Sequence, residues 1–201
     1  MAFVNIKRKE VHLKIVYYGP GRCGKTTNLE YIYEKCKKQI GSEMVAIKTQ
    51  GDRTLFFDYL PMDVGTVRGF TIKVRLYTVP GQVIYNETRR LVLKGVDGVV
   101  FVADSLKVRN EKNRASLKNL QENLAAYRKS IFKIPMVMQY NKRDLEGCGI
   151  PLSPVNVLER CLNRRLQRPF FTASALKGDN VLPTLKKIIT ATVESLSDEL
   201  S

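Results

Sequence analysis

Gly19-Pro-Gly-Arg-Cys-Gly-Lys-Thr26 is the stretch that decides the fold, and the residues on either side of it fit the same interpretation. It matches the phosphate-loop pattern G-x-x-x-x-G-K-[ST]. Residues 11–18 become wholly apolar, as a strand entering a core does, and residues 26–36 carry apolar side chains at helical spacing. A strand, a glycine-rich loop and a helix in this order predict a site for the phosphates of a nucleotide.

Each residue type in this loop suits contact with phosphate. Glycines let the backbone curl so that successive N–H groups point inward. Lys25 supplies a positive charge to the outer phosphates, and the Thr26 hydroxyl is a hard oxygen ligand for Mg²⁺. The residues expected to contact the nucleotide here are Gly19, Pro20, Gly21, Arg22, Cys23, Gly24, Lys25, Thr26 and Thr27.

Short apolar strands alternate with amphipathic helices along the rest of the chain. Strands are expected at 70–79, 98–104, 134–140 and 169–173, and helices at 113–127, 154–166 and 181–196. In the last helix the residues expected to face inward are Leu182, Leu185, Ile188, Ile189 and Val193.

This alternation predicts an α/β fold of the P-loop NTPase type. Helices cover both faces of a central, mostly parallel sheet, which gives three layers, αβα. The length of 201 residues suits one domain over 1–201. In such sheets ligands bind at the carboxyl ends of the strands.

The segment Asn141-Lys-Arg-Asp144 follows a predicted strand and suits recognition of guanine. Guanine offers two adjacent donors on one edge, which the carboxylate of Asp144 can accept together. Adenine would face that carboxylate with an acceptor and leave a buried charge unpaired. The stem of Lys142 can lie over the base, and Asn141 is expected to tie this loop to the phosphate loop.

The charge balance is strongly basic. Thirty-four lysines and arginines against nineteen acidic residues give a net charge of +15, and residues 107–168 hold fourteen basic and five acidic side chains. Such a field favours anionic partners, including nucleotide, acidic protein, nucleic acid or anionic lipid. A basic nucleic-acid-binding protein with an incidental nucleotide site is therefore an alternative function, but no zinc, helix-turn-helix or RNP-like signature supports it, so we do not expect nucleic acid to be the partner.

The sequence favours a cytoplasmic protein. No apolar run reaches the length of a membrane span, and no signal peptide, myristoylation start or prenylation box is recognised. The four cysteines lack zinc-ligand spacing and are expected to be reduced thiols.

The chain resembles MglA-type bacterial Ras-like GTPases, which control cell polarity and motility. The resemblance is dense from about residue 5 to 105, continues through Asn141 to Asp144, and fades over 145–201. It implies a Ras-like fold, GTP and GDP as ligands with Mg²⁺, and slow intrinsic hydrolysis that acts as a switch. The stretches that carry it are 14–21, 52–58, 76–82 and 94–104.

The resemblance implies a role for each matching position. Gln82 would orient the attacking water, and Arg53 would act as an arginine finger in cis. Thr54 would reach Mg²⁺ in the active state. Thr78, Gly81 and Gln82 occupy the place of the D-x-x-G-Q switch of Ras, so Thr78 stands where most small GTPases have an Mg²⁺-linked Asp. At the guanine end of the site, the resemblance adds Ser174, Ala175 and Leu176 as contacts. Leu176 stands where Ras-like proteins have a lysine, and this change weakens stacking on that side of the base.

The resemblance also implies partners and a rival interpretation. The partners would be an MglB-like roadblock activator and downstream polarity or motility effectors, with polar placement in the cell, and the charge adds attraction to an anionic membrane.

Arg22 stands where relatives have an apolar residue; it points to solvent, clamps phosphate or hinders the switches. The last possibility keeps open a pseudo-GTPase, a nucleotide-binding interaction module that barely hydrolyses.

Overall fold

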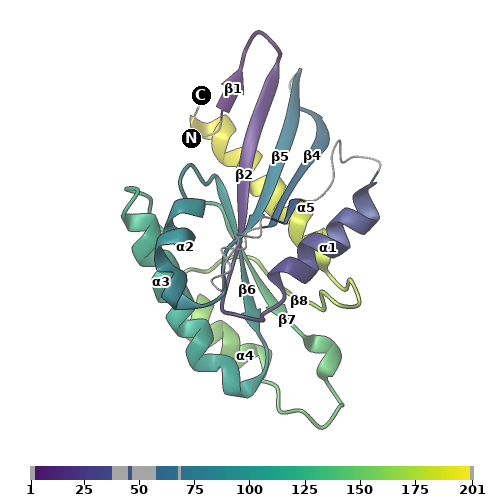
Figure 1. Cartoon of the computed structure of the whole chain (residues 1–201), viewed down its shortest axis with the longest axis vertical. Coiled ribbons are helices and arrows are strands. Elements are labelled where there is room, and N and C mark those ends of the chain that lie inside the picture. The colour runs from purple at the N-terminus through teal and green to yellow at the C-terminus, as the bar shows by residue number, and fades with distance from the viewer. Residues whose placement is uncertain (1–2, 38–44, 47–57, 68, 200–201) are drawn as a thin grey trace.

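The computed structural model describes residues 3–37, 45–46, 58–67 and 69–199. Its centre is an eight-stranded sheet in the order β3-β4-β5-β2-β6-β7-β8, with β1 paired to β2 (Figure 1). The strands are β1 (Phe3–Asn5), β2 (Glu10–Tyr18), β3 (Val45–Ala46), β4 (Asp58–Val67), β5 (Phe70–Thr78), β6 (Gly98–Asp104), β7 (Met136–Asn141) and β8 (Phe170–Thr172).

The sheet is mostly parallel, as predicted. β5, β2, β6, β7 and β8 run parallel to one another, and their carboxyl ends meet at one edge. β4 pairs antiparallel with β5 and was not predicted. Its sequence contains Pro61 and Gly65, and the register shifts between Asp63 and Gly65, so the ordinary strand signal is broken at that point.

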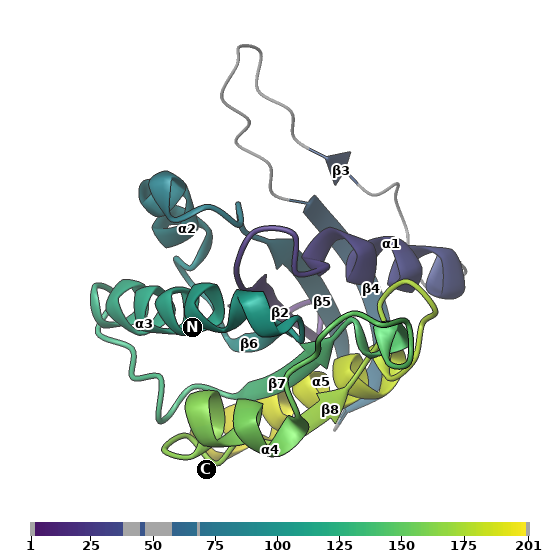
Figure 2. The ribbon, with the colours of Figure 1, turned by 90° about the horizontal axis from the view of Figure 1, so that it is seen from below.

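Helices cover the sheet on both faces, which confirms the three-layer αβα arrangement. α1 and α5 lie on one face and α2, α3 and α4 on the other (Figure 2). The helices are α1 (Lys25–Cys36), α2 (Asn86–Val92), α3 (Asn110–Ala125), α4 (Val155–Leu158) and α5 (Val181–Glu199). Short 3₁₀ turns η2 (Val83–Tyr85), η3 (Lys107–Arg109) and η4 (Arg143–Leu145), and a π-helical turn η5 (Glu159–Asn163), complete the described part.

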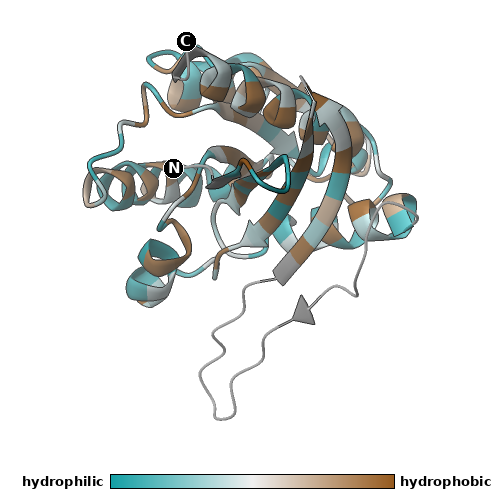
Figure 3. Ribbon diagram, turned by 90° about the horizontal axis from the view of Figure 1, so that it is seen from above, coloured by the Kyte–Doolittle hydropathy of each residue, from teal (hydrophilic) through white to brown (hydrophobic). Residues whose placement is uncertain are grey.

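Two apolar cores flank the sheet, one on each face. Leu29 of α1 and Ile188 of α5 pack on one side, whereas Leu120 and Leu124 of α3 pack on the other. The strands carry apolar residues along their length, and the helices alternate between apolar and polar faces (Figure 3). Burial of apolar surface on both sides of the sheet is therefore the main force that holds the layers together.

Two details of the predicted helices are wrong. The helix expected over 154–166 is an α-helix only as far as Leu158 and continues as the π-helical turn η5. Leu182 was expected to face inward, but its side chain is 37% exposed. The buried stripe of α5 runs through Val181, Leu185 and Ile188, and Leu182 lies about 100° around the helix from Val181.

In the described part of the chain, no helix has the length and apolar character needed to cross a membrane.

Candidate nucleotide-binding site

A cavity of about 980 Å³ opens at the carboxyl ends of the parallel strands. It lies where such sheets bind their ligands. Most of the predicted nucleotide contacts line it. These are Gly21, Arg22, Gly24, Lys25, Thr26, Thr27, Thr78, Gly81, Gln82, Asn141, Lys142, Asp144, Ala175 and Leu176. The lining also includes Glu30, Val79, Pro80, Tyr85 and Leu145, which were not predicted.

The phosphate loop connects β2 to α1 and holds Lys25 inside it. The Lys25 ammonium donates to the carbonyl of Pro20 at 2.8 Å and to that of Gly19 at 3.3 Å. Its side chain is buried, so the charge is fixed over the loop rather than free in solvent. A fixed cation beside the N-terminus of α1 is an arrangement that attracts phosphate.

Gly24 is a position in this loop where only glycine fits. It precedes α1 with φ +99°, a left-handed conformation, and a Cβ built on it would lie 2.2 Å from Nδ2 of Asn141. Asn141 uses that Nδ2 to donate to the carbonyl of Cys23 at 2.7 Å. The close approach explains how the loop that begins at Asn141 can be joined directly to the phosphate loop, as predicted for Asn141.

Asn141 also fastens the third loop of the site. Its Oδ1 accepts the backbone N–H of Ala175 at 2.8 Å, so one side chain joins three loops that are far apart in the sequence. Ala175 lines the cavity, and Ser174 is buried behind it with its Oγ accepting the N–H of Lys177. Leu176 is 77% exposed at the rim, where it can cover a base.

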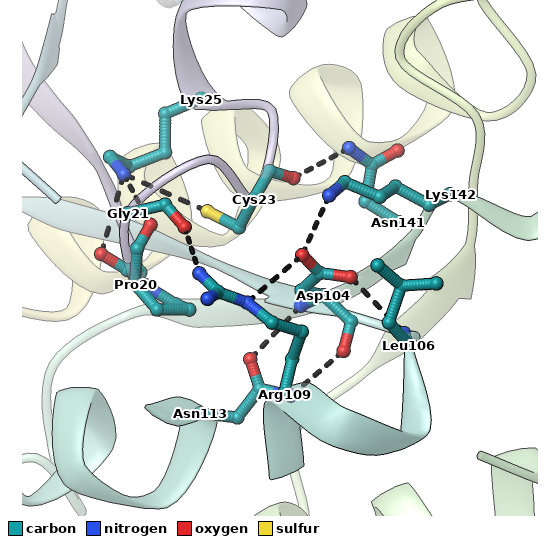
Figure 4. Close-up of polar contacts among 11 residues, drawn as sticks. Pro20, Gly21, Cys23, Lys25, Asp104, Leu106, Arg109, Asn113, Asn141 and Lys142 are labelled. Atoms are coloured by element: carbon teal, nitrogen blue, oxygen red, sulfur yellow. Dashed lines mark hydrogen bonds and ion pairs between the residues drawn. The ribbon is translucent and has the colours of Figure 1, made fainter. Parts of the chain in front are cut away.

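Asp104, at the end of β6, organises the floor of the site and was missed as a functional residue (Figure 4). Its side chain is fully buried, and Oδ2 accepts Lys142 Nζ at 2.7 Å while Oδ1 accepts the N–H of Leu106 at 3.1 Å. This pairing orients the lysine whose stem was expected to lie over the base. A carboxylate at the carboxyl end of a central strand was the available sequence signal.

Arg109 joins the same carboxylate to the phosphate loop. Its Nε lies 3.5 Å from Asp104 Oδ2, and its guanidinium also donates to the carbonyl of Gly21 (Figure 4). The residue lies at the end of η3, in a polar stretch whose pattern carries no signal for such a contact. The pair of the buried Asp104 and the partly buried Arg109 therefore supports both the Lys142 side and the phosphate side of the cavity.

The segment after β5 passes against the phosphate loop. A Cβ built on Gly81 would lie 2.2 Å from the Cα of Gly21, so glycine is required for this approach. Gln82 follows on the cavity side and is exposed. Arg89 of α2 is 0% exposed and holds this segment from behind, because its NH1 donates to the carbonyls of Pro80 and Gly81 at 3.3 and 3.0 Å.

Arg89 belongs to a buried polar network between α2, α3 and β2. Its Nε donates to the Tyr18 hydroxyl at 3.0 Å, its NH2 donates to Ser116 Oγ at 2.8 Å, and the guanidinium stacks 4.3 Å from the Tyr18 ring centroid. Asn119 accepts the Tyr18 hydroxyl proton at 2.7 Å, and Asn123 donates to the same oxygen at 3.2 Å. Among the described residues no carboxylate pairs with this guanidinium.

Some predicted residues are near the cavity without lining it. The carbonyls of Gly19 and Pro20 accept from Lys25, and Cys23 is buried beneath the loop. Burial raises the pKa of the Cys23 thiol above its usual value, which disfavours the reactive thiolate. Arg53 and Thr54 lie outside the described residues.

The residues present fit a nucleotide with Mg²⁺. The glycine cradle leaves room where a side chain would clash, and Thr26 presents its hydroxyl at the cavity wall. In the described part of the chain no group of three His, Cys, Asp or Glu side chains is placed to hold a metal alone. Mg²⁺ is ordinarily held by few protein oxygens together with substrate phosphates and water, so a single hydroxyl is an adequate anchor.

Comparison with known proteins agrees with this geometry. A profile of the Ras family matches residues 14–194. The chain is 50% identical over 188 residues to the mutual gliding-motility protein MglA of Myxococcus xanthus (strain DK1622), and the alignment covers 94% of each chain. The matched residues 14–194 span the phosphate loop, Asp104 and Asn141. The chain therefore belongs to the Ras family, within which it is an MglA-type small GTPase.

Proposed function

We propose that this chain binds GTP and GDP with Mg²⁺, hydrolyses GTP slowly, and uses the difference between the two states as a switch, with residues 1–201 acting as one domain. The observation that carries the proposal is the Asn141 junction. It joins the phosphate loop, the base-reading loop and the Ala175 loop around one cavity. Ras-like GTPases bind guanine nucleotides and Mg²⁺ in general, which supports the same assignment.

The phosphates would lie over the loop formed by residues 19–26. Loop N–H groups and the N-terminus of α1 would bind phosphate oxygens, and Lys25 would contact the outer phosphates. Thr26 would hold Mg²⁺, joined by Thr54 in the active state and with Thr78 nearby at the end of β5. Mg²⁺ bound there would neutralise charge on the phosphate oxygens.

Guanine would be selected by Asp144 at the opposite end of the cavity. Its carboxylate would accept both donors on the base edge. Lys142 would lie along one face of the base, because its ammonium is drawn to Asp104 at 2.7 Å. Leu176 would cover the other face through apolar contact alone, and the N–H of Ala175 lies beside the same end of the cavity.

Hydrolysis would rely on positioning rather than on covalent chemistry. Gln82 would orient the attacking water and Arg53 would approach late to stabilise charge on the transferring phosphate. Gln82 is exposed in this structure, so an intrinsic rate limited by its positioning is expected. An MglB-like roadblock activator docking near the switches would fix both residues, and effectors of polarity or motility would read the GTP state.

A pseudo-GTPase remains the rival function because of Arg22. This residue is exposed, has φ +63°, and lines both the nucleotide cavity and a smaller cavity of about 380 Å³ beside Gln82. Its exposure favours a side chain that points to solvent. A guanidinium so close to Gln82 is nevertheless the feature that would hinder hydrolysis if it occupied the place of the attacking water.

Single-turnover hydrolysis separates the two functions. The protein is loaded with radiolabelled GTP, Mg²⁺ is added, and phosphate release is followed in wild type, Gln82→Ala and Arg53→Ala, with and without a roadblock-type activator. We expect slow basal release, acceleration by the activator, and loss of acceleration in both variants. GTP that stays bound and uncleaved under every condition would establish the pseudo-GTPase, and recovery in Arg22→Ala would assign the cause.

Base selection is tested independently of hydrolysis. Asp144→Asn replaces the double acceptor by a side chain that also donates, so affinity for GTP should fall by orders of magnitude while affinity for xanthosine triphosphate rises. Fluorescent-nucleotide displacement measures both. Equal affinity for GTP and ATP in the wild type would contradict the assignment of Asp144.

A further inference from the structure

A second cavity, of about 530 Å³, lies between α3 and the turn that follows α4, away from the nucleotide site. It shares no lining residue with the nucleotide cavity. α3 and α4 lie on the same face of the sheet (Figures 1 and 2), and the connection from α3 to β7 contributes Ile131 and Phe132 to the cavity lining. We call it the arginine groove, and its lining is Leu117, Gln121, Ile131, Phe132, Arg160, Cys161, Leu162, Arg164, Arg165 and Leu166.

The floor of the arginine groove is apolar. Ile131 and Leu162 are buried, and Leu117 and Leu166 are partly buried beneath the opening. Phe132 stands at the rim with 46% of its surface exposed. A concave apolar floor with an exposed aromatic rim provides a place for an apolar anchor side chain of a partner.

The π-helical turn η5 gives the groove a rigid wall. Arg164 N–H donates to the carbonyl of Glu159 at 2.8 Å, five residues back. Asn163 holds the following turn closed, because its Oδ1 accepts the N–H of Arg168 at 2.9 Å and its Nδ2 donates to the Arg168 carbonyl at 2.7 Å. π-helical turns are rare and occur frequently at functional sites.

This wall carries a cluster of unpaired positive charge. Arg160, Arg164 and Arg165 are exposed, and no ion pair among the described residues involves any of them. The acid within the turn is Glu159, whose carboxylate is directed inward, where it accepts from the Tyr140 hydroxyl and from Asn163. The guanidinium of Arg165 lies 5.8 Å from the centroid of Phe132, which places positive charge next to the aromatic rim.

We propose that the arginine groove docks an acidic segment of a partner protein, one that places carboxylates on Arg160, Arg164 and Arg165 and an apolar side chain on the floor. Guanidinium groups bind carboxylates in a paired, directional way, which lysines do not. A flat bilayer surface would leave the concave apolar floor empty. Duplex nucleic acid would contact the arginines through its phosphates, but its bases are stacked inside the helix and would leave the floor empty.

Fluorescence anisotropy with defined probes tests this directly. The main probe is a labelled peptide of glutamate and alanine with one central Leu-Leu-Phe anchor, and the second is the same peptide with serines in place of the anchor. The groove variant combines Arg160→Ser, Arg164→Ser and Arg165→Ser. The control variant removes the same charge elsewhere through Lys94→Ser, Lys186→Ser and Lys187→Ser, all exposed positions.

We expect the groove variant to bind the anchored peptide about tenfold or more weakly, and the control variant to lose less than about twofold. Phe132→Ser should weaken binding of the anchored peptide alone. Equal losses in both triple variants would overturn the proposal in favour of a diffuse electrostatic effect. Tighter, groove-dependent binding of phosphatidylglycerol vesicles or duplex DNA would also overturn it, since the partner class would then be wrong.

Peptide binding to the arginine groove can be measured independently of GTP binding and hydrolysis, because the groove and the nucleotide cavity have separate linings. Thermal unfolding should show the same midpoint for both triple variants, since all six substituted side chains are exposed.

Discussion

Two interfaces of the molecule differ in chemistry: the apolar interface between α5 and the sheet, and the polar interface between α2 and α3. α5 is held by Val181, Leu185 and Ile188, which are buried aliphatic side chains. α2 is held by Arg89, whose guanidinium bonds to β2, to α3 and to the carbonyls of Pro80 and Gly81. Aliphatic packing tolerates small displacements, whereas a buried charge needs all its partners at once.

The difference matters because α2 follows directly on the segment that carries Gln82. Apart from Val92, α2 contributes little to the apolar core, and Leu91 is 65% exposed. Its position therefore depends on hydrogen bonds that are made or lost together. We expect an element held in this way to move as a unit, which is the property expected of a switch.

The largest effect on stability should come from removing Arg89 from the polar interface between α2 and α3. Arg89→Ala leaves Ser116 and two carbonyls without their donor and opens a cavity, so we expect a loss of about 4 kcal/mol in the free energy of unfolding. Urea denaturation followed by circular dichroism measures it. A loss below about 1 kcal/mol would mean that α2 rests on apolar packing as α5 does.

The stability of the apolar interface between α5 and the sheet should fall when a buried side chain loses volume. Leu185→Ala removes a buried side chain from α5 and should lower the free energy of unfolding by about 3 kcal/mol. Leu182→Ala, three residues earlier in the same helix and exposed, is the matched control and should change it by less than about 0.5 kcal/mol. Similar losses in the two variants would contradict the observed buried stripe of α5.

Two adjacent tyrosines on β2 sharpen the comparison, since they point to opposite faces of the sheet. The Tyr18 hydroxyl bonds to Arg89, Asn119 and Asn123, so Tyr18→Phe should cost about 1–3 kcal/mol. The Tyr17 hydroxyl is buried on the α5 side with no hydrogen-bond partner among the described residues, so Tyr17→Phe should be neutral or stabilising. Chemical denaturation under identical conditions gives the free energy of unfolding of each variant. Equal losses of stability in the two variants would contradict the proposed difference between the two hydroxyls.

The smallest effect is expected at alkaline pH. Burial raises the pKa of the Tyr17 phenol, while the unfolded phenol ionises near its usual value of about 10. The unfolded state then binds fewer protons than the folded state, so stability falls as pH rises above about 10. In Tyr17→Phe this decline should be shallower than in wild type. Unfolding free energies at pH 8 and pH 10.5 would reveal it, and identical slopes would contradict it.

Most of the parallel sheet, and most of the residues that line the cavity at the carboxyl ends of its strands, could be predicted from the sequence, because both depend on local patterns. The phosphate loop needs glycine, lysine and threonine at fixed spacing, and β6 is a continuous buried run flanked by Gly98 and Asp104. The Asn141 contact with the phosphate loop was likewise predicted and is confirmed at 2.7 Å. The roles of Gln82, Thr26 and Asp144 stay predictions until nucleotide is measured.

The remaining features depend on contacts between distant residues, which no local pattern reports. Arg89 and Arg109 look like surface cations in a basic chain. Arg89 nevertheless bonds to Tyr18 and Ser116, which are far from it in the sequence, and Arg109 bonds to the carbonyl of Gly21 in the phosphate loop. β4 was hidden by Pro61 and Gly65, which usually end strands. The clustering of Arg160, Arg164 and Arg165 could be counted in the sequence, but that they share one concave surface could not.

The π-helical turn η5 also has a consequence for how this surface could have arisen. A π-turn is an α-helical turn with one additional residue, so a single-codon insertion within 159–163 would be sufficient to create it. Removing one residue there would rotate every later side chain of the turn by about 100° and carry Arg164 and Arg165 away from α3. A change of one residue in length, with no change in the fold, would then decide whether a member of the family has this groove.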